Sequence, residues 1–456
     1  MRKIHALCCG AAALVGSSVA MADHCNFVYD FGLGTPGPAV ATGSNFVSMF
    51  RPSDVGSPGT TKLYVGGSFD TIGGVAGTAS IATWDGTSFA QVGGGLFLID
   101  MVAGSPVYRS CQVNAAVEFN GALYIGGQFD GDGTGVVSRG VIRWNGTAYE
   151  SVNLKDVDVG AYTVWALAVY KGELYAGGNF PNMGTGGGIS IAKYVPGTND
   201  WVDVGASALG VGSNVFDLQV YNDGVSEKLY ACGNFVSIGG VAGTKHIAAF
   251  DGTAWSSVGG GYITSGGSSY ARDLVVFDDG TGPALYAAGG LVVVDPTLTP
   301  SSVNRWNGKS WKAIPGFLDN PSVASATVNS IGLYNDGTGT TILVQVRLFG
   351  GGVGTPLIMR LENGRFKEVA GSGIGTASGS TTQSIQEMLQ YDDGSGSKLF
   401  VGGTFTDING TPANRILTIT GCTPVGNACP ADFNASGTLE VADIFDFLNA
   451  WFAGCP

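Results

Sequence analysis

Oxygen-bearing residues recur at a regular spacing near the end of this 456-residue chain. Six of them occupy positions 1, 3, 5, 7, 9 and 12 of a loop, and Gly437 stands at position 6, where the sharp turn of a calcium loop falls. Hard oxygen ligands at this spacing suit Ca²⁺, because the chain wraps around the ion while alternate residues point inward. The sequence therefore predicts a Ca²⁺ site made by Asp432, Asn434, Ser436, Thr438, Glu440 and Asp443.

A helix over residues 441–452 is predicted to follow the loop directly. Its apolar residues follow the spacing i, i+1, i+3, i+4, i+7 and i+8, which places them on a single face: Ile444, Phe445, Phe447, Leu448, Trp451 and Phe452. Cys429 and Cys455 bracket the loop and the helix. We expect a disulfide between them, because a unit this small commonly needs a covalent link.

The C-terminal unit, residues 423–456, resembles one repeat of a dockerin module. It is especially similar to the dockerin-type anchoring tails of planctomycete-like exported proteins, on the residues Asp-Ile-Phe-Asp-Phe-Leu-Asn-Ala-Trp-Phe-Ala-Gly-Cys-Pro. The resemblance implies Ca²⁺ binding and docking to a cohesin-type or cell-surface partner through residues 429–456, with the apolar helix face as the contact. Dockerins normally hold two repeats, and Ser436 replaces the usual acidic ligand, which lowers the expected affinity. The alternative interpretation is a metal-free structural cap.

The N-terminal 22 residues have the pattern of a secretory signal peptide. Arg2 and Lys3 precede an apolar stretch over residues 6–19, and Ala20-Met21-Ala22 is a small-x-small cleavage site. We therefore expect a secreted or cell-surface protein that is cleaved near Ala22. The alternative is a buried N-terminal helix. No apolar run in the mature chain reaches the roughly 18 residues of a membrane-spanning helix.

Charge narrows the range of partners. Loss of two cations with the signal peptide takes the net charge from −13 to −15. The remaining cations are scattered and form no basic stripe that would neutralise phosphates. The sequence thus argues against nucleic acid and against an anionic membrane surface as partners.

Internal repeats determine the predicted fold. A Leu-Tyr-x-Gly-Gly run or a degraded copy of it starts at residues 63, 123, 174, 229, 285, 342 and 399, which gives seven units of 51 to 60 residues. Each unit has four strand-like runs, of which the first ends and the fourth begins with an aromatic residue. In five units Asp-Gly or Asn-Gly separates the third run from the fourth and predicts a tight hairpin with positive φ at both turn residues. We predict an all-β fold, a seven-bladed β-propeller over residues 23–422, built of four-stranded antiparallel blades.

The double glycine after the second run and the tryptophan near the fourth resemble the kelch and galactose-oxidase-type propellers. The most similar local segment is Tyr194-Val-Pro-Gly-Thr-Asn-Asp-Trp201, and the resemblance covers roughly residues 25–421.

The seventh unit lacks a fourth strand, and the mature N-terminus offers one. Residues 26–31 are predicted to complete the seventh blade, which would bring Cys25 beside Cys422 and allow a disulfide between them. For Cys111 and Cys232 the sequence leaves two alternatives open, a bond between them or two buried free thiols.

Catalytic chemistry has little support in the sequence. Only His24 and His246 remain in the mature chain, too few for a copper site of the galactose-oxidase type, and no phosphate-binding loop or zinc-protease motif is present. Four Asp-Gly pairs, at 223–224, 279–280, 336–337 and 393–394, are predicted to form turns rather than to bind ligands.

We therefore assign no catalytic residue, and two functional hypotheses follow. The favoured one is an exported, non-enzymatic binding or structural module that takes a polysaccharide or protein ligand on a propeller face. The alternative is a secreted glycoside hydrolase or polysaccharide lyase, which would need two carboxylates near the central channel.

Overall fold

The computed structural model describes residues 25–30, 45–102, 105–152, 162–184, 189–205, 213–261, 270–292, 300–337, 339–350, 356–369, 372–374 and 383–424. The chain divides into two units, of which the larger is Val28–Gly421 and the smaller comprises Met1–Phe27 and Cys422–Pro456. The signal peptide, the predicted Ca²⁺ ligands, the predicted docking helix, and Cys429 with Cys455 all lie outside the described residues.

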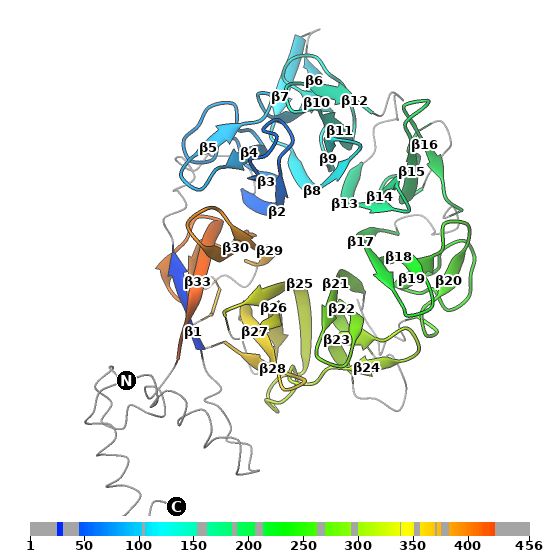
Figure 1. Cartoon of the computed structure of the whole chain (residues 1–456), viewed down its shortest axis with the longest axis vertical. Coiled ribbons are helices and arrows are strands. Elements are labelled where there is room, and N and C mark those ends of the chain that lie inside the picture. Colours follow the sequence, from blue (N-terminus) through cyan, green and yellow to red (C-terminus); the bar gives the residue numbers. More distant parts are fainter. Residues whose placement is uncertain are drawn as a thin grey trace, which may run out of the picture. The chain divides into compact units, whose positions relative to one another are not determined.

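The larger unit is all-β, as the sequence predicts, and its described strands form seven four-stranded blades arranged as a propeller-like ring (Figure 1). Blade 1 consists of β2 (Phe46–Ser53), β3 (Lys62–Ser68), β4 (Ile81–Trp84) and β5 (Phe89–Gln91). Blade 2 consists of β8 (Gln112–Phe119), β9 (Ala122–Gln128), β11 (Val141–Trp144) and β12 (Tyr149–Ser151). Blade 3 consists of β13 (Thr163–Tyr170), β14 (Glu173–Asn179), β15 (Ile191–Val195) and β16 (Asp200–Asp203).

Blade 4 consists of β17 (Val215–Asn222), β18 (Glu227–Gly233), β19 (Ile247–Phe250) and β20 (Trp255–Ser257). Blade 5 consists of β21 (Ala271–Asp278), β22 (Pro283–Val292), β23 (Ser301–Trp306) and β24 (Trp311–Ala313). Blade 6 consists of β25 (Ser325–Asn335), β26 (Thr340–Phe349), β27 (Pro356–Glu362) and β28 (Arg365–Glu368). Consecutive strands pair antiparallel in blades 1 to 6, and the pair Gly290 and Thr327 joins blades 5 and 6 into one sheet.

Blade 7 combines both ends of the chain. It has the strand order β1-β33-β30-β29, with β1 (Cys25–Asp30), β33 (Ile416–Pro424), β30 (Ser397–Gly403) and β29 (Ile385–Asp392). This is the place that the sequence predicts for residues 26–31. The side chains of Cys25 and Cys422 lie outside the described part, so their disulfide stays a prediction. Cys111 and Cys232 are buried free thiols, which decides between the two alternatives.

Hydrophobic cores fill the spaces between neighbouring blades. Val117 and Tyr124 of blade 2 belong to the same buried cluster as Val164 and Trp201 of blade 3, and corresponding clusters join other neighbours. The cluster that contains Phe50 and Phe400, whose ring centroids lie 6.0 Å apart, packs blade 7 on blade 1. Burial between blades is thus the driving force that holds the ring together.

The two glycines of the repeated motif have separate steric causes. A Cβ at Gly127, the second glycine of blade 2, would lie 2.1 Å from the backbone oxygen of Gln112 on the neighbouring strand. A Cβ at Gly126, the first glycine, would lie 2.8 Å from Cγ1 of Val164 in blade 3. The second glycine therefore allows the innermost strand of its own blade to approach closely. The first glycine allows the next blade to pack against its strand.

A left-handed residue precedes the third strand in five blades. Ser80, Gly140, Ser190, His246 and Arg415 have φ between 56° and 74°. In blade 4, the N–H of His246 donates to Phe235 O at 3.1 Å, and its carbonyl accepts from Gly233 N–H at 3.1 Å. Burial lowers the pKa of His246 to about 4. This histidine is therefore a neutral part of the repeated scaffold.

The predicted hairpins between third and fourth strands are corrected by the structure. Of the five predicted hairpins, only Asn363-Gly364 is a two-residue turn with positive φ at both residues. In blade 1 the loop spans residues 85–88, and Asp85 Oδ1 accepts from the N–H groups of Thr87 and Ser88 at 2.9 and 2.8 Å. The same side-chain capping occurs at Asn145, Asp251 and Asn307. In these four turns the Asp or Asn oxygen caps the two N–H groups, and only the glycine that follows has a positive φ, of 90° to 101°.

Two further features were not foreseen. A hairpin of β6 (Leu96–Val102) and β7 (Ser105–Arg109), with β10 (Gly131–Asp132) paired to β6, is inserted between blades 1 and 2. A small pair, β31 (Asp407–Ile408) and β32 (Thr411–Pro412), follows β30. The first strand of blade 1 also continues beyond Phe50, which pairs with Val65. The described residues include no helix long and apolar enough to cross a membrane.

Candidate functional site: the central channel

The innermost strand of every blade has a β-bulge at the same place. Pairing with the second strand shifts by one residue there, so a single residue stands without a partner opposite the glycine pair or its replacement. We call these seven the bulge residues: Ser48, Asn114, Trp165, Phe216, Arg272, Asn329 and Gln386.

All seven bulge residues line one cavity of about 740 Å³, and all are partly exposed. The strands that carry them face the centre of the ring (Figure 1). The volume falls within the range of roughly 300–1,000 Å³ that is usual for small-molecule sites. The bulge therefore turns one side chain per blade into the central channel.

The aromatic side chains of Trp165 and Phe216 line the cavity. The rings of Trp165 and Phe216 have centroids 5.2 Å apart, and Tyr270 continues the row at 5.5 Å from Phe216. The guanidinium carbon of Arg272 lies 5.9 Å from the Phe216 ring centroid. We call Trp165, Phe216 and Tyr270 the aromatic ledge, which runs from blade 3 to blade 5.

Neutral hydrogen-bonding groups form most of the opposite side. Asn114 donates to Val164 O at 3.1 Å, and Ser48 donates to Val113 O at 2.7 Å, so each links its blade to the next. In blade 6, Gln345 replaces the first glycine of the motif, and Asn329 donates to its side-chain oxygen at 2.9 Å. These groups retain unused donor or acceptor capacity toward the channel.

Two aspartates beside the bulge residues bridge neighbouring blades. Asp217 accepts from the N–H of Leu218 at 2.7 Å and from the N–H of Leu274 in blade 5 at 3.0 Å. Asp273 likewise accepts from Leu274 at 2.9 Å and from Ile331 in blade 6 at 2.9 Å. Both oxygens of each carboxyl are therefore engaged in holding adjacent blades together.

Burial changes the charge state of these acids. It raises the pKa of Asp217 to about 6, against the pull of the two N–H groups. Burial and the nearby Asp217 raise the pKa of Asp273 to about 8. Glu387 holds the equivalent position in blade 7, and burial together with both aspartates raises its pKa well above the usual range. Burial therefore favours the protonated form of both Asp273 and Glu387.

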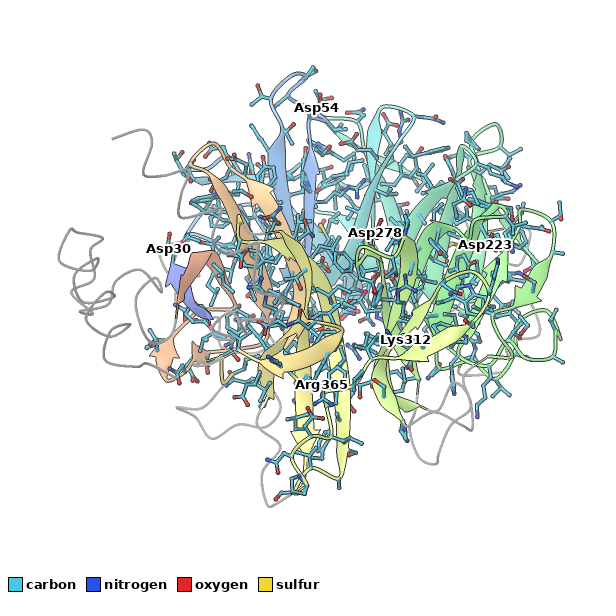
Figure 2. The ribbon with its side chains drawn as sticks, turned by 60° about the horizontal axis from the view of Figure 1, so that its bottom comes forward. Asp30, Asp54, Asp223, Asp278, Lys312 and Arg365 are labelled. Atoms are coloured by element: carbon cyan, nitrogen blue, oxygen red, sulfur yellow. The ribbon has the colours of Figure 1, made fainter. Side chains whose placement is uncertain are left out.

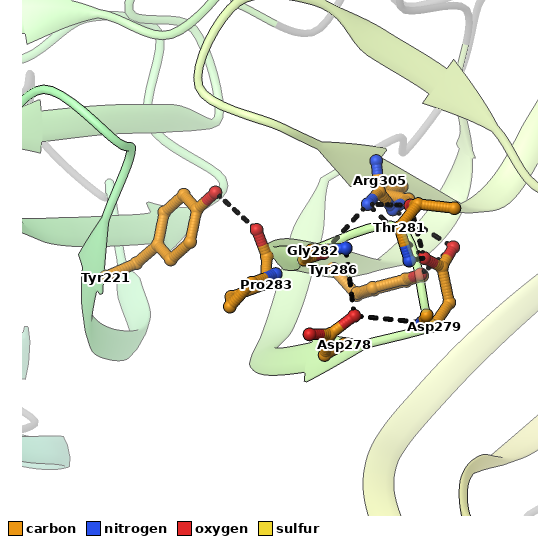
Figure 3. Close-up of polar contacts among 9 residues, drawn as sticks. Tyr221, Asp278, Asp279, Thr281, Gly282, Pro283, Tyr286 and Arg305 are labelled. Atoms are coloured by element: carbon orange, nitrogen blue, oxygen red, sulfur yellow. Dashed lines mark hydrogen bonds and ion pairs between the residues drawn. The ribbon is translucent and has the colours of Figure 1, made fainter.

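The four predicted turn aspartates have a structural role at the turns between first and second strands. In blade 5, Asp279 accepts from Tyr286 OH at 3.0 Å and pairs with Arg305 at 3.2 Å (Figure 3). Tyr221 of blade 4 donates to Pro283 O at 3.0 Å in the same view. Asp223, Asp336 and Asp393 pair with Lys228, Arg360 and Lys398. Figure 2 labels Asp223 and Asp278 of these turns, with Asp54 of the corresponding turn in blade 1.

Sequence reasoning missed the channel residues because the bulge residues share no chemical type. A positional signal exists, however. Each bulge residue directly follows a small or β-branched apolar residue, and in six of the seven blades it stands five residues before the strand-end aromatic, as Trp165 does between Val164 and Tyr170. Within the described residues, no cluster of three or more His, Cys, Asp or Glu side chains has the arrangement of a metal site.

Comparison with known proteins adds little. No protein-family model and no curated protein matches the chain, so the kelch-type and dockerin-type resemblances stay predictions. The extracellular domain of the hybrid two-component system BT4673 from B. thetaiotaomicron is 12% identical at a TM-score of 0.49, covering 90% of this chain and 42% of that one. The chain thus spans less than half the length of that protein domain.

Two further solved structures are similar at a lower level. The Dos1 propeller is 11% identical at a TM-score of 0.39, covering 88% of this chain and 96% of that one. The polysaccharide lyase Uly1 is 12% identical at a TM-score of 0.28, covering 82% of this chain and 76% of that one. Likenesses at this level do not assign a function.

Proposed function

We propose that the protein is an exported, non-enzymatic seven-bladed β-propeller that binds its ligand in the central channel. One observation carries this proposal. The channel aspartates Asp217 and Asp273 each use both oxygens to accept backbone N–H groups from two blades. A carboxyl committed in this way stabilises the ring and is poorly placed to act as nucleophile or base.

The histidine inventory supports the same proposal. His246 is buried, and it is held by Gly233 and Phe235 within the blade scaffold. General acid–base catalysis needs a group within hydrogen-bond reach of a substrate proton, and this histidine lies in the blade wall. The signal-peptide pattern of residues 1–22 supports export.

The experiment is a paired screen of the mature protein. Glycan and protein arrays measure retention, and a panel of soluble polysaccharides measures release of shorter products. The proposal expects retention without product. Release of reducing ends or of unsaturated sugars by the wild-type protein would contradict it.

A secreted carbohydrate-active enzyme is the second candidate, and one observation favours it. Burial and the nearby Asp273 and Asp217 raise the pKa of Glu387, and a raised pKa favours the protonated state that a general acid requires. The discriminating variant is Glu387→Gln, which preserves size and hydrogen bonding. Loss of product release with retained binding would establish the enzyme.

For the C-terminus we propose anchoring through a Ca²⁺-binding dockerin-like unit, with Asp432, Asn434, Ser436, Thr438, Glu440 and Asp443 as ligands. The support is the sequence pattern alone. A calorimetric Ca²⁺ titration of the mature chain, compared with the double variant Asp432→Ala/Asp443→Ala, tests it. Binding that is lost in the variant is expected, and equal heats in both proteins would contradict the proposal.

A further inference from the structure

We infer that the aromatic ledge of the channel is a stacking subsite for a neutral oligosaccharide. This inference rests on the proposed binding function and names its ligand class. It starts from the geometry of Trp165, Phe216 and Tyr270, whose ring centroids follow one another at 5.2 and 5.5 Å. Trp165 and Phe216 both line the cavity and are partly exposed.

A row of partly exposed aromatic rings is suited to bind a ligand that has extended apolar faces. The rings are tilted by 54° and 60° to one another, so they offer a stepped surface instead of a single slot. The C–H faces of successive pyranose rings match such a surface, because the negative face of an aromatic ring attracts polarised C–H groups. Flat, fully apolar ligands would leave the polar wall opposite unsatisfied.

That polar wall favours hydroxyl groups. Asn114, Asn329 and Gln386 are amides that both donate and accept, as sugar hydroxyls do. Glu387 also lines the cavity, and its carboxyl, whose pKa burial raises, has the same dual character when it is protonated. A neutral polyhydroxylated ligand can therefore satisfy the wall without an unpaired charge.

Charge argues against an anionic ligand. The channel's Arg272 already lies against the Phe216 ring, and it is close enough to Asp273 to lower that residue's pKa. The whole chain carries a net charge of −13, which repels polyanions at long range. At long range, uronic-acid polymers and acidic peptides thus meet an unfavourable field, while the cavity itself is lined by two arginines, Arg51 and Arg272.

The test uses the mature protein and a defined panel. Cellopentaose, laminaripentaose, mannopentaose, xylopentaose and maltopentaose are the neutral probes, and tetragalacturonate and a proline-rich decapeptide are the competitors. Binding is measured by calorimetry for the wild type, Trp165→Ala and Phe216→Ala. Tyr108→Ala is the matched control, since Tyr108 is an aromatic residue 43% exposed on the β6–β7 hairpin, outside the channel.

We expect saturable binding of at least one neutral pentasaccharide, weakened tenfold or more in Trp165→Ala and in Phe216→Ala and unchanged in Tyr108→Ala. Trp165→Phe keeps a ring face and should stay within threefold of the wild type. Unfolding midpoints check that each variant is folded. Trp165→Leu, which fills much of the same volume without a ring, replaces Trp165→Ala if that variant does not fold.

Other outcomes separate this inference from the proposed function. Equal affinity in wild type, Trp165→Ala and Phe216→Ala would overturn the ledge as a subsite and leave the binding function intact. Tighter binding of tetragalacturonate or of the peptide would also overturn the inference alone, as would no binding of any neutral probe. Product release from a bound pentasaccharide that is lost in Trp165→Ala would overturn the non-enzymatic function and support the ledge.

Discussion

The contacts between blades and the lining of the channel differ in how strictly they repeat. At the second glycine of the motif, six of the seven blades have glycine, because a Cβ would meet the innermost strand's backbone: Gly67, Gly127, Gly178, Gly233, Gly289 and Gly403. At the bulge, a few ångströms away, the seven blades present six residue types. The same blade geometry is thus compatible with strict repetition and with divergence.

The contrast separates scaffold from site. The residue type at the repeated positions is fixed by a steric or hydrogen-bonding requirement of the ring. The outer-strand tryptophans are an example, since Trp201, Trp255 and Trp311 each donate to a carbonyl of the preceding blade at 2.8 to 3.0 Å. The bulge positions diverge in residue type, and all seven line one cavity.

The largest effect is expected at a repeated glycine. Gly127→Val places a side chain where even a Cβ lies 2.1 Å from Gln112 O, so the blade must open. We expect a loss of about 3 kcal/mol or more in the free energy of unfolding. Gly197→Ala, at a glycine with no atom within 4 Å of an added Cβ, is the control and should change stability by less than about 0.5 kcal/mol. Chemical denaturation measures both variants. Equal losses of unfolding free energy in the two variants would contradict the steric role of the repeated glycine.

A pair of tryptophans gives the next largest effect. Trp201→Phe removes the Nε1–H bond to Val152 O from a fully buried position, which should cost about 1–3 kcal/mol because the carbonyl loses its partner. Trp165→Phe, in the channel wall, should cost less than about 0.5 kcal/mol. Thermal unfolding of both variants sharpens the comparison, and the reverse order would refute it.

The channel acids predict a pH dependence. A carboxyl whose folded-state pKa is raised binds more protons in the folded state, so stability falls as pH rises toward that pKa. Between pH 6.5 and 8, Asp273 with its pKa of about 8 contributes a falling slope. His246, whose folded-state pKa is lowered to about 4, contributes a smaller rise in stability, because the histidine of the unfolded chain loses its proton near pH 6.5. We expect a fall of up to about 1.4 kcal/mol per pH unit for each proton concerned.

The matching variant is Asp273→Asn, which cannot ionise. Its unfolding free energy should vary less between pH 6.5 and 8 than that of the wild type. An unchanged slope in the variant would show that Asp273 does not titrate in this range.

The smallest effect concerns an exposed turn. Backbone and hydroxyl donors at Thr87 and Ser88 lower the pKa of Asp85 to about 2. Asp85→Ala should cost about 0.5 kcal/mol near pH 7, in keeping with its exposed position. The difference between wild type and variant should persist at pH 4 and vanish as pH falls through 2, since a lowered pKa stabilises the folded state only above it. A difference that vanishes by pH 4 would contradict the capping role.

The features of the fold that could be predicted from the sequence are those that repeat along the chain. The Leu-Tyr-x-Gly-Gly copies and the aromatic pair between third and fourth strands, such as Trp84 and Phe89 with centroids 4.8 Å apart, predicted strands and their order. Four of the five Asp-Gly and Asn-Gly hairpins were predicted with the wrong geometry, because Asp and Asn can form a turn either with a positive φ of their own or by side-chain capping. The β6–β7 hairpin occurs once and left no pattern to compare.

The channel could not be predicted for the opposite reason. Trp165, Phe216 and Arg272 share neither residue type nor charge, and their common position appears only when the bulge register is known. Glu387 stood among the other glutamates of the sequence with nothing to mark it. Its proximity to Asp217 and Asp273 depends on ring closure, which brings blade 7 to the same cavity.

Hydroxyl-radical footprinting of the mature protein, with and without the tightest-binding neutral pentasaccharide, tests the central claim most directly. Oxidation of partly exposed rings reports which of them the ligand covers. The account predicts that the oxidation rates of Trp165 and Phe216 fall on binding, while Tyr108 stays reactive and the buried Trp201 stays unreactive. Unchanged rates at Trp165 and Phe216, with protection elsewhere on the ring, would contradict the assignment of the channel as the binding site.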